Sequence, residues 1–169
     1  MTYVAEFGVT GLRLAPRTPS PRNRAPARPR CRDSRWPQVA AALAALRADK
    51  RRSVRLVDAD CGAGTLLLCA VRLARALGFT AIEARGVDAA PALIGRARAA
   101  AAALHDPAIG ITFEQGMPGA VEDEVDFPAD IVLWHGGERS ADQAARRATE
   151  QALASAGRAL IADRPRAAA

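Results

Sequence analysis

A glycine-rich segment with two acidic residues is the part of this sequence best suited to ligand chemistry. It reads Val-Asp-Ala-Asp-Cys-Gly-Ala-Gly-Thr over residues 57–65 and ends a short β-rich run. Glycine lets the backbone approach a ligand closely and lets a helix begin at once. Asp58 and Asp60 place negative charge beside this loop. These carboxylates would repel a pyrophosphate and attract a cationic ligand, so the loop favours a cation over a dinucleotide.

The segments that must position this loop alternate between strand and helix patterns. β-rich runs cover 53–59, 80–89, 109–116, 129–135 and 158–163, and helical patterns cover 37–50, 65–78, 91–105 and 138–157. Such alternation predicts an α/β fold with βαβ units, a mostly parallel, doubly wound sheet and helices on both faces. Ligands of these sheets bind outside the carboxyl ends of the strands. The rule selects 58–64, 88–90, 116–118 and 134–136.

Three segments within residues 36–163 resemble the class I S-adenosylmethionine-dependent methyltransferases. The first motif of that family is an apolar strand, an acid and Gly-x-Gly-x-Gly, which residues 57–65 resemble. Gly86-Val87-Asp88 resembles the end of the second strand, and Ala129-Asp130-Ile131-Val132 resembles the start of the fourth. The resemblance implies a Rossmann-like sheet of about five strands in the order 3-2-1-4-5. Here we expect a departure from the family, because the final antiparallel pair that it usually adds is lacking.

The resemblance also implies a cofactor, S-adenosylmethionine, and a set of residues that bind it. Asp58 matches the motif acid, Gly62 and Gly64 match the second and third glycines, and Asp88 matches the acid that accepts hydrogen bonds from both ribose hydroxyls. A carboxylate suits a vicinal diol because it accepts twice and donates nothing. The cofactor-binding residues implied in this way are Asp58, Asp60, Cys61, Gly62, Gly64, Asp88, Ala89, Met117, Pro118 and Trp134.

The sequence departs from the family pattern at two positions of the site. Asp60 replaces the first motif glycine, which would cost roughly 1–2 kcal/mol if that position required a left-handed backbone. Met117 replaces the acid that reads the adenine amino group, although it could still pack on the adenine face. The acidic run 122–126 follows soon after. It either supplies a substitute acid or forms a solvated loop, and we favour the loop.

The end of the predicted fourth strand carries two residues that could take part in methyl transfer. This reaction is an in-line displacement that depends mainly on alignment of the two substrates. His135 is the candidate proton acceptor for a hydroxyl or amine, and Trp134 could face a cationic group. The alternatives are a core Trp and a His that caps a helix or meets water.

Small apolar packing is the favoured role of Cys61 and Cys69. No cluster in the sequence has the spacing of a metal site.

Positive charge is concentrated at the start of the chain. The formal charge is +6, and eight of the 24 basic residues lie within the first 36 residues, whereas residues 37–169 hold equal numbers of bases and acids. Residues 1–35 are rich in Arg and Pro and predict a largely flexible arm, followed by a methyltransferase-like domain over 36–169. Residues 13–35 could bind nucleic acid; a solvated tail is the alternative.

The remaining composition indicates a cytoplasmic protein. Its three cysteines are too few for a disulfide framework, which favours a reducing compartment. No apolar stretch reaches the length of a membrane span, and the beginning of the chain does not resemble a secretory signal. The open edge of the fifth strand could pair with a second copy to form a homodimer.

Three functions follow from the sequence as hypotheses. The first is methyl transfer from S-adenosylmethionine to an acceptor, which we expect to be a small molecule. The second is a catalytically degenerate S-adenosylmethionine-binding or protein-interaction module. The third is an RNA-associated protein that uses the basic arm. Loss of S-adenosylmethionine binding in Asp88→Ala would support the first two, and salt-dependent RNA binding through residues 1–34 would support the third.

Overall fold

Five parallel strands form one sheet in the order β3-β2-β1-β4-β5, which confirms the predicted fold class and strand order. The computed structural model describes residues 31–119, 128–136 and 143–163. The strands are β1 (Ser53–Asp58), β2 (Ala81–Asp88), β3 (Ile109–Gln115), β4 (Ile131–Trp134) and β5 (Leu160–Ala162), and the helices are α1 (Trp36–Ala48), α2 (Thr65–Ala76), α3 (Pro91–Ala101) and α4 (Gln143–Ser155). All four strand pairings are parallel, so the carboxyl ends of the strands meet at one edge of the sheet.

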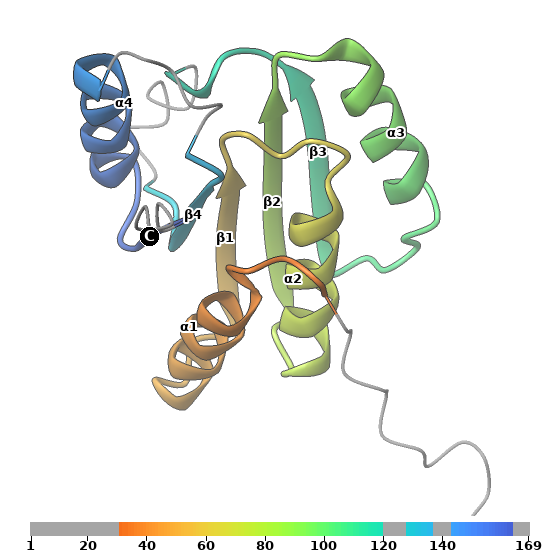
Figure 1. Cartoon of the computed structure of the whole chain (residues 1–169). Coiled ribbons are helices and arrows are strands. Elements are labelled where there is room, and N and C mark those ends of the chain that lie inside the picture. The colour runs from red at the N-terminus through yellow and green to blue at the C-terminus, as the bar shows by residue number, and fades with distance from the viewer. Residues whose placement is uncertain (1–30, 120–127, 137–142, 164–169) are drawn as a thin grey trace, which may run out of the picture.

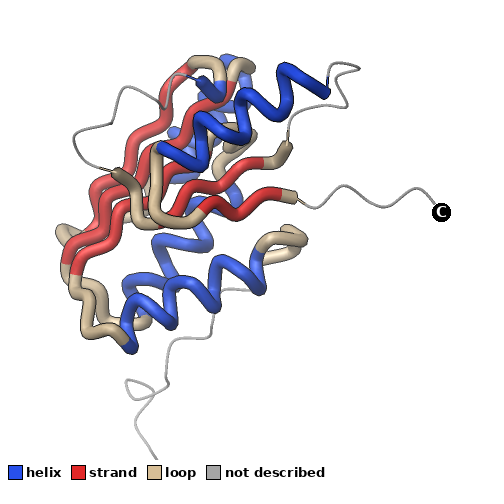
Figure 2. Tube along the Cα trace, turned by 90° about the vertical axis from the view of Figure 1, so that its left-hand side faces the viewer, coloured by secondary structure: helices blue, strands red, loops and turns tan. Residues whose placement is uncertain are grey.

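The two faces of the sheet carry separate apolar layers. Helices α1, α2 and α3 pack on one face, where Leu43, Leu67 and Ala97 join the inward side chains of β1 and β2. Helix α4 covers part of the other face through Leu153, which packs with Val132 and Trp134. Figures 1 and 2 show the sheet between these two layers. The core therefore continues to the carboxyl edge, where the predicted ligand-binding loops begin.

Local sequence signals determine where the helices begin. Pro37 lies in the first turn of α1, a position where its missing N–H is not needed. Gly64 is the N-cap of α2 and has a left-handed backbone with φ of 74°. Eight of the twelve residues of α2 are buried. Their burial between α1 and the sheet fixes the loop that precedes this helix.

Some predicted element boundaries differ from those in the structure. The predicted helix 91–105 ends at Ala101, and residues 102–105 form a turn and irregular backbone before Asp106-Pro107. Strand β4 is shorter than predicted, since Ala129 forms only an isolated bridge with Gly157. The first residues of the predicted helix 138–157 lie outside the described residues, as do the acidic run 122–126 and residues 1–30 of the predicted arm.

The described residues at the beginning of the chain lie against the body of the molecule. Cys31 packs against the apolar core, and Arg35, which we assigned to the arm, is only 5% exposed. The division into an arm and a domain stays a prediction, because most of the arm is outside the described residues. Within the described part of the chain, no helix is long and apolar enough to cross a membrane.

Candidate functional site at the carboxyl edge of the sheet

The loop between β1 and α2 crosses the carboxyl ends of the neighbouring strands. The Ala59 N–H donates to the carbonyl of Leu133 at 2.9 Å, and the Cys61 N–H donates to the carbonyl of Val87 at 3.0 Å. These two bonds attach the loop to β4 on one side and to β2 on the other. The predicted switch point between β1 and β4 therefore lies beneath residues 59–64.

Two glycines shape this loop for different physical reasons. Gly62 and Gly64 have φ of 55° and 74°. A Cβ atom on Gly64 would lie 2.7 Å from the ring of Phe113, so Gly64 is required for packing as well as conformation. A Cβ atom on Gly62 would have no other heavy atom within 4 Å. The backbone at Gly62 therefore borders open space that a ligand could enter.

The carboxylate of Asp88 connects the second strand to the glycine loop. Its Oδ2 accepts the N–H of Gly62 at 2.8 Å, and its Oδ1 accepts the N–H of Ala90 at 2.8 Å. Each oxygen keeps a second lone pair, so the carboxylate can accept two further hydrogen bonds. The carboxyl of Asp60 is close enough to use one of them. Asp88 is 6% exposed. Two backbone amides thus hold it in place before any ligand arrives.

Asp60 adopts a backbone conformation that any residue tolerates. Among the described residues other than glycine, only Lys50 has a positive φ. The conformational cost considered for an aspartate at the first glycine position therefore does not arise. Burial, and next the charge of Asp88, raise the pKa of Asp60, while His135 opposes the rise. This mutual repulsion of two carboxylates would be relieved by a cationic ligand.

A buried ion pair lies below the loop, between the last residue of β1 and the residue before α1. Asp58 is fully buried, and its Oδ1 is 4.0 Å from Nη1 of Arg35. The other guanidinium nitrogens of Arg35 donate to both carboxylate oxygens of Asp33, at 3.0 Å from Nε and 2.9 Å from Nη2. The sequence patterns did not identify Arg35 as a partner of Asp58. The available signal was the need of Asp58, a buried acid, for a cation nearby. Arg35 lies just before the predicted helix start and could meet that need.

The Arg35–Asp58 pair is incompletely satisfied. Among the residues that the structure describes, Nη1 of Arg35 and both oxygens of Asp58 have no hydrogen-bond partner. Burial raises the pKa of Asp58 to about 7; Arg35 opposes this rise and Asp60 adds to it. Because Asp58 is inaccessible, it would act on a bound cation through its electric field rather than by contact.

The side chain of Cys61 points away from the open side of the loop. The residue is 8% exposed and packs in the same apolar cluster as Phe113 and Ala97. Burial, with the charges of Asp58 and Asp88, raises the pKa of the Cys61 thiol to about 12. The thiol is therefore protonated at neutral pH and is not an activated nucleophile. Only the backbone of Cys61 contributes to the loop.

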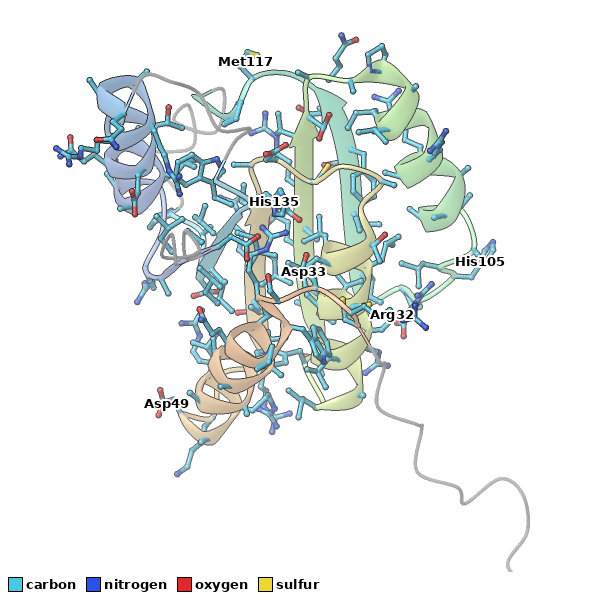
Figure 3. All side chains as sticks on the ribbon, in the orientation of Figure 1. Arg32, Asp33, Asp49, His105, Met117 and His135 are labelled. Carbon is cyan, nitrogen blue, oxygen red and sulfur yellow. The ribbon has the colours of Figure 1, made fainter. Side chains whose placement is uncertain are left out.

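The loops after β2 and β3 lie beside each other. The N–H of Gly116 donates to the carbonyl of Asp88 at 3.1 Å, and Nε2 of Gln115 donates to the carbonyl of Ala89 at 3.3 Å. Ala89 is exposed and Pro118 is half-buried. Met117 is 67% exposed, and Figure 3 shows it on the loop beyond the end of β3. Its thioether is free to contact a ligand, but it does not replace the expected hydrogen-bond acceptor.

The end of β4 sends its two predicted residues in different directions. Trp134 is 2% exposed and packs in the α4 layer, with the guanidinium of Arg146 5.7 Å from its ring centroid. The cation that Trp134 faces is therefore Arg146, and contact of Trp134 with a cofactor stays a prediction. His135 is 60% exposed, and its Nδ1 lies 2.8 Å from Oδ2 of Asp163.

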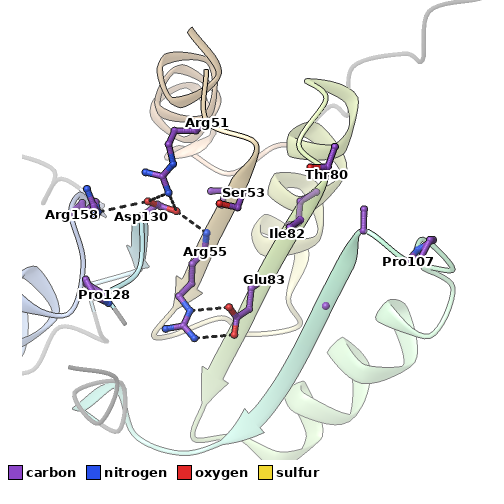
Figure 4. Close-up of a pocket in the computed structure, with 14 residues that line it drawn as sticks. Arg51, Ser53, Arg55, Thr80, Ile82, Glu83, Pro107, Pro128, Asp130 and Arg158 are labelled. Carbon is purple, nitrogen blue, oxygen red and sulfur yellow. Dashed lines mark hydrogen bonds and ion pairs between the residues drawn. The ribbon is translucent and has the colours of Figure 1, made fainter. Parts of the chain in front are cut away.

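A separate cavity of about 550 Å³ lies at the opposite edge of the sheet, near the amino ends of β1 and β2 (Figure 4). Asp130 lines this cavity and accepts hydrogen bonds from Nη2 of Arg51 and the N–H of Arg55, both at 2.9 Å. Nε of Arg158 lies 3.8 Å from the same carboxylate. Asp130 thus joins the beginnings of β1 and β4. It is remote from the glycine loop, and its role is structural.

The strand order is that of a Rossmann-like fold, which solved structures of class I S-adenosylmethionine-dependent methyltransferases share. Examples among the solved structures that share this fold are three proteins at 20–22% sequence identity. One is a protein from Listeria monocytogenes assigned to that class, which is 21% identical with a TM-score of 0.50 and matches over 66% of this chain and 33% of its own.

The second is magnesium protoporphyrin IX methyltransferase from Synechocystis with bound S-adenosylmethionine, at 22% identity and a TM-score of 0.51; the match covers 73% of this chain and 54% of that one. The third is the methyltransferase domain of bacterial CtHen1, at 20% identity and a TM-score of 0.50. The match covers 74% of this chain and 63% of that one. The chain thus spans from a third to less than two thirds of these proteins. No protein-family model and no curated protein sequence matches it.

Proposed function

We propose that this chain binds S-adenosylmethionine at the carboxyl edge of its sheet and transfers the methyl group to a small-molecule acceptor. The observation that carries the proposal is the arrangement of Asp88, whose carboxylate is held by two backbone amides and keeps two acceptor sites beside the open side of Gly62. The bound S-adenosylmethionine found in a neighbour of the same fold supports it.

The residues at this edge fit the chemical groups of the proposed ligand. The spare lone pairs of Asp88 can accept both hydroxyls of a ribose. The half-buried backbone at Gly62 can approach the methionine part without steric hindrance, since a Cβ there would meet nothing within 4 Å. Asp60 supplies negative potential toward a sulfonium and an ammonium group, and Asp58 adds to it when it is ionised. Ala89, Met117 and Pro118 would lie beside the adenine.

When bound, S-adenosylmethionine supplies an electrophilic methyl group on a positively charged sulfur. The chain contributes alignment, because the described edge holds the nucleoside end through Asp88 and leaves His135 exposed nearby. We assign His135 as the group that accepts the proton of the acceptor, since general bases in enzymes are most often histidines.

Binding of S-adenosylhomocysteine, measured by titration calorimetry, tests the proposal. Asp88→Ala removes both ribose acceptors and should weaken binding by about 3 kcal/mol or more, roughly 150-fold, because hydrogen bonds to charged groups are each worth about 1.5–3 kcal/mol. Glu83→Gln is the matched control, because Glu83 is an exposed carboxylate on the same strand, toward its opposite end. Equal affinity in Asp88→Ala and Glu83→Gln would refute the assigned site.

A binding module without turnover is the second candidate function. The exposed Met117 supports it, because the position that reads the adenine amino group offers no strong acceptor. Tight binding of S-adenosylhomocysteine without methyl transfer to any acceptor would favour this function. The predictions of nucleic-acid binding through residues 13–35 and of a homodimer through the sheet edge stay predictions.

A further inference from the structure

The ends of β4 and β5 bring a histidine and an aspartate to the same level of the carboxyl edge. The strands are parallel, with Trp134 paired to Ala162 in the register. The residues that follow, His135 and Asp163, are therefore neighbours, and the N–H of Asp163 donates to the carbonyl of Trp134 at 3.2 Å. The sheet itself thus positions this pair, although 28 residues separate its members in the sequence.

The contact between these residues determines which imidazole nitrogen is available. Nδ1 of His135 lies 2.8 Å from Oδ2 of Asp163. A carboxylate only accepts hydrogen bonds, so this contact favours the tautomer with the hydrogen on Nδ1. In the neutral imidazole, Nε2 then keeps a free lone pair. No described residue is bonded to Nε2, and the His135 side chain is 60% exposed.

A second bond fixes the aspartate from the other side. Oδ1 of Asp163 accepts a hydrogen bond from Oγ of Ser34, the residue between Asp33 and the buried Arg35. The Asp163 carboxylate is therefore held by groups from two separate parts of the chain and is 26% exposed. This arrangement restricts rotation of Asp163 and, through it, of the imidazole.

The pair faces the same edge as the glycine loop. His135 is near enough to Asp60 to oppose the rise in the pKa of that carboxyl. Burial raises the pKa of Asp33, but hydrogen bonds from Arg35 outweigh burial and hold this pKa below its ordinary value, and His135 adds a weaker lowering effect. In the described part of the chain, the charged groups near His135 include Asp33, Asp60 and Asp163. The imidazole lies on the cofactor side of the proposed site.

We propose that Asp163 is a positioning residue that orients His135, with Nε2 directed toward the methyl acceptor. This inference rests on the proposed function. As the acceptor lone pair bonds to the methyl carbon, the electron pair of the carbon–sulfur bond remains on sulfur, and the hydroxyl or amine proton of the acceptor passes to Nε2. Asp163 stabilises the imidazolium that results and touches no substrate.

Nitrogen NMR of the imidazole rings in the full chain tests the positioning directly, without an acceptor. The chain has two histidines, so His105 is an internal reference. We expect neutral His135 to carry its hydrogen on Nδ1 in the wild type and to lose this preference in Asp163→Ala. The control is Asp49→Ala, which alters an exposed aspartate at the end of α1 and should leave the hydrogen on Nδ1. Hydrogen on Nε2 in the wild type would overturn the inference.

Methyl transfer from radiolabelled S-adenosylmethionine to a panel of simple phenols and amines tests the catalytic part. We expect Asp163→Ala to lower kcat about 10-fold or more with little change in KM, consistent with the loss of a partner that orients a functional imidazole. In a His135→Ala background, Asp163→Ala should have no further effect on kcat. Independent, multiplying effects of the two substitutions would overturn the inference.

Binding of S-adenosylhomocysteine separates this inference from the proposed function. Every variant of His135 and Asp163 should bind it as the wild type does. A wild-type protein that fails to bind refutes the proposed function, while the hydrogen position on His135 still decides whether Asp163 orients the ring. A protein that binds the nucleoside but methylates no member of the panel would overturn the catalytic role of the pair.

Discussion

Oδ2 of Asp88 accepts the N–H of Gly62 at 2.8 Å, so the end of β2 holds the loop that follows β1. One carboxylate therefore both stabilises the glycine loop and offers acceptor sites to a ligand on that loop. Its structural and binding roles must be separated in any experiment. The predictions that follow concern the loop, the ion pair below it and the cysteines beside it.

The two loop glycines should respond differently to alanine. We expect Gly64→Ala to lower the free energy of unfolding by about 3 kcal/mol, because it combines a left-handed backbone with a contact of 2.7 Å to Phe113. Gly62→Ala should cost about 1 kcal/mol, from backbone conformation alone. Urea denaturation measures both values. Equal losses would show that the Phe113 contact does not constrain the loop.

Stability should depend on pH through Asp58. Its pKa is about 7 in the folded chain, against about 4 in the unfolded chain. Between these values the folded chain keeps a proton that the unfolded chain has released, so the free energy of unfolding falls as the pH rises from about 4 to 7. Asp58→Asn should remove this part of the dependence. Identical pH profiles for wild type and Asp58→Asn, measured by denaturation, would contradict the raised pKa.

Arg35 should matter more above pH 7 than below pH 5. Arg35→Met leaves the ionised, buried Asp58 without its nearest cation, and breaking such a pair costs about 3 kcal/mol or more. Below pH 5, Asp58 is protonated and the loss should be smaller. The exposed Arg96→Met is the control and should change stability by less than about 0.5 kcal/mol. A loss independent of pH would show that Arg35 acts only through packing and Asp33.

The cysteines should differ in their reactivity toward an aromatic disulfide reagent. Burial raises the pKa of Cys61 to about 12 and that of Cys69 to about 11. Both thiols should react slowly at pH 8 in the folded protein, whereas the half-buried Cys31 should be labelled first. Mass spectrometry of the labelled peptides gives the order. Early labelling of Cys61 would mean that its thiol faces the open side of the loop.

The sequence predicted the parts of the structure that depend on local pattern and chain order. Strand and helix periodicity predicted the α/β class, and the resemblance to class I methyltransferases supplied the strand order. The rule for carboxyl ends brought Gly62 and Asp88 to the same edge. The sequence did not reveal which side chains meet across the carboxyl edge of the sheet. Arg35 was assigned to the arm because its neighbours are rich in Arg and Pro, yet Asp58 requires a buried cation. Composition cannot show such a long-range requirement.

The predicted role of Trp134 illustrates a second limit. The sequence placed it at the correct edge, but strand alternation directs its ring to the α4 face, where Arg146 lies over it. Asp163 was missed although the predicted order already put the ends of the fourth and fifth strands together. The available signal was a polar residue directly after the fifth strand, at the level of His135.

A crystal structure of the full chain with S-adenosylhomocysteine tests the central claim most directly. We expect the ribose hydroxyls within hydrogen-bond distance of the Asp88 carboxylate and the amino-acid end above the backbone of Gly62. Density for the nucleoside elsewhere, for instance in the cavity beside Asp130 at the other edge of the sheet, would contradict the account, as would crystals grown at saturating nucleoside with none bound at Asp88.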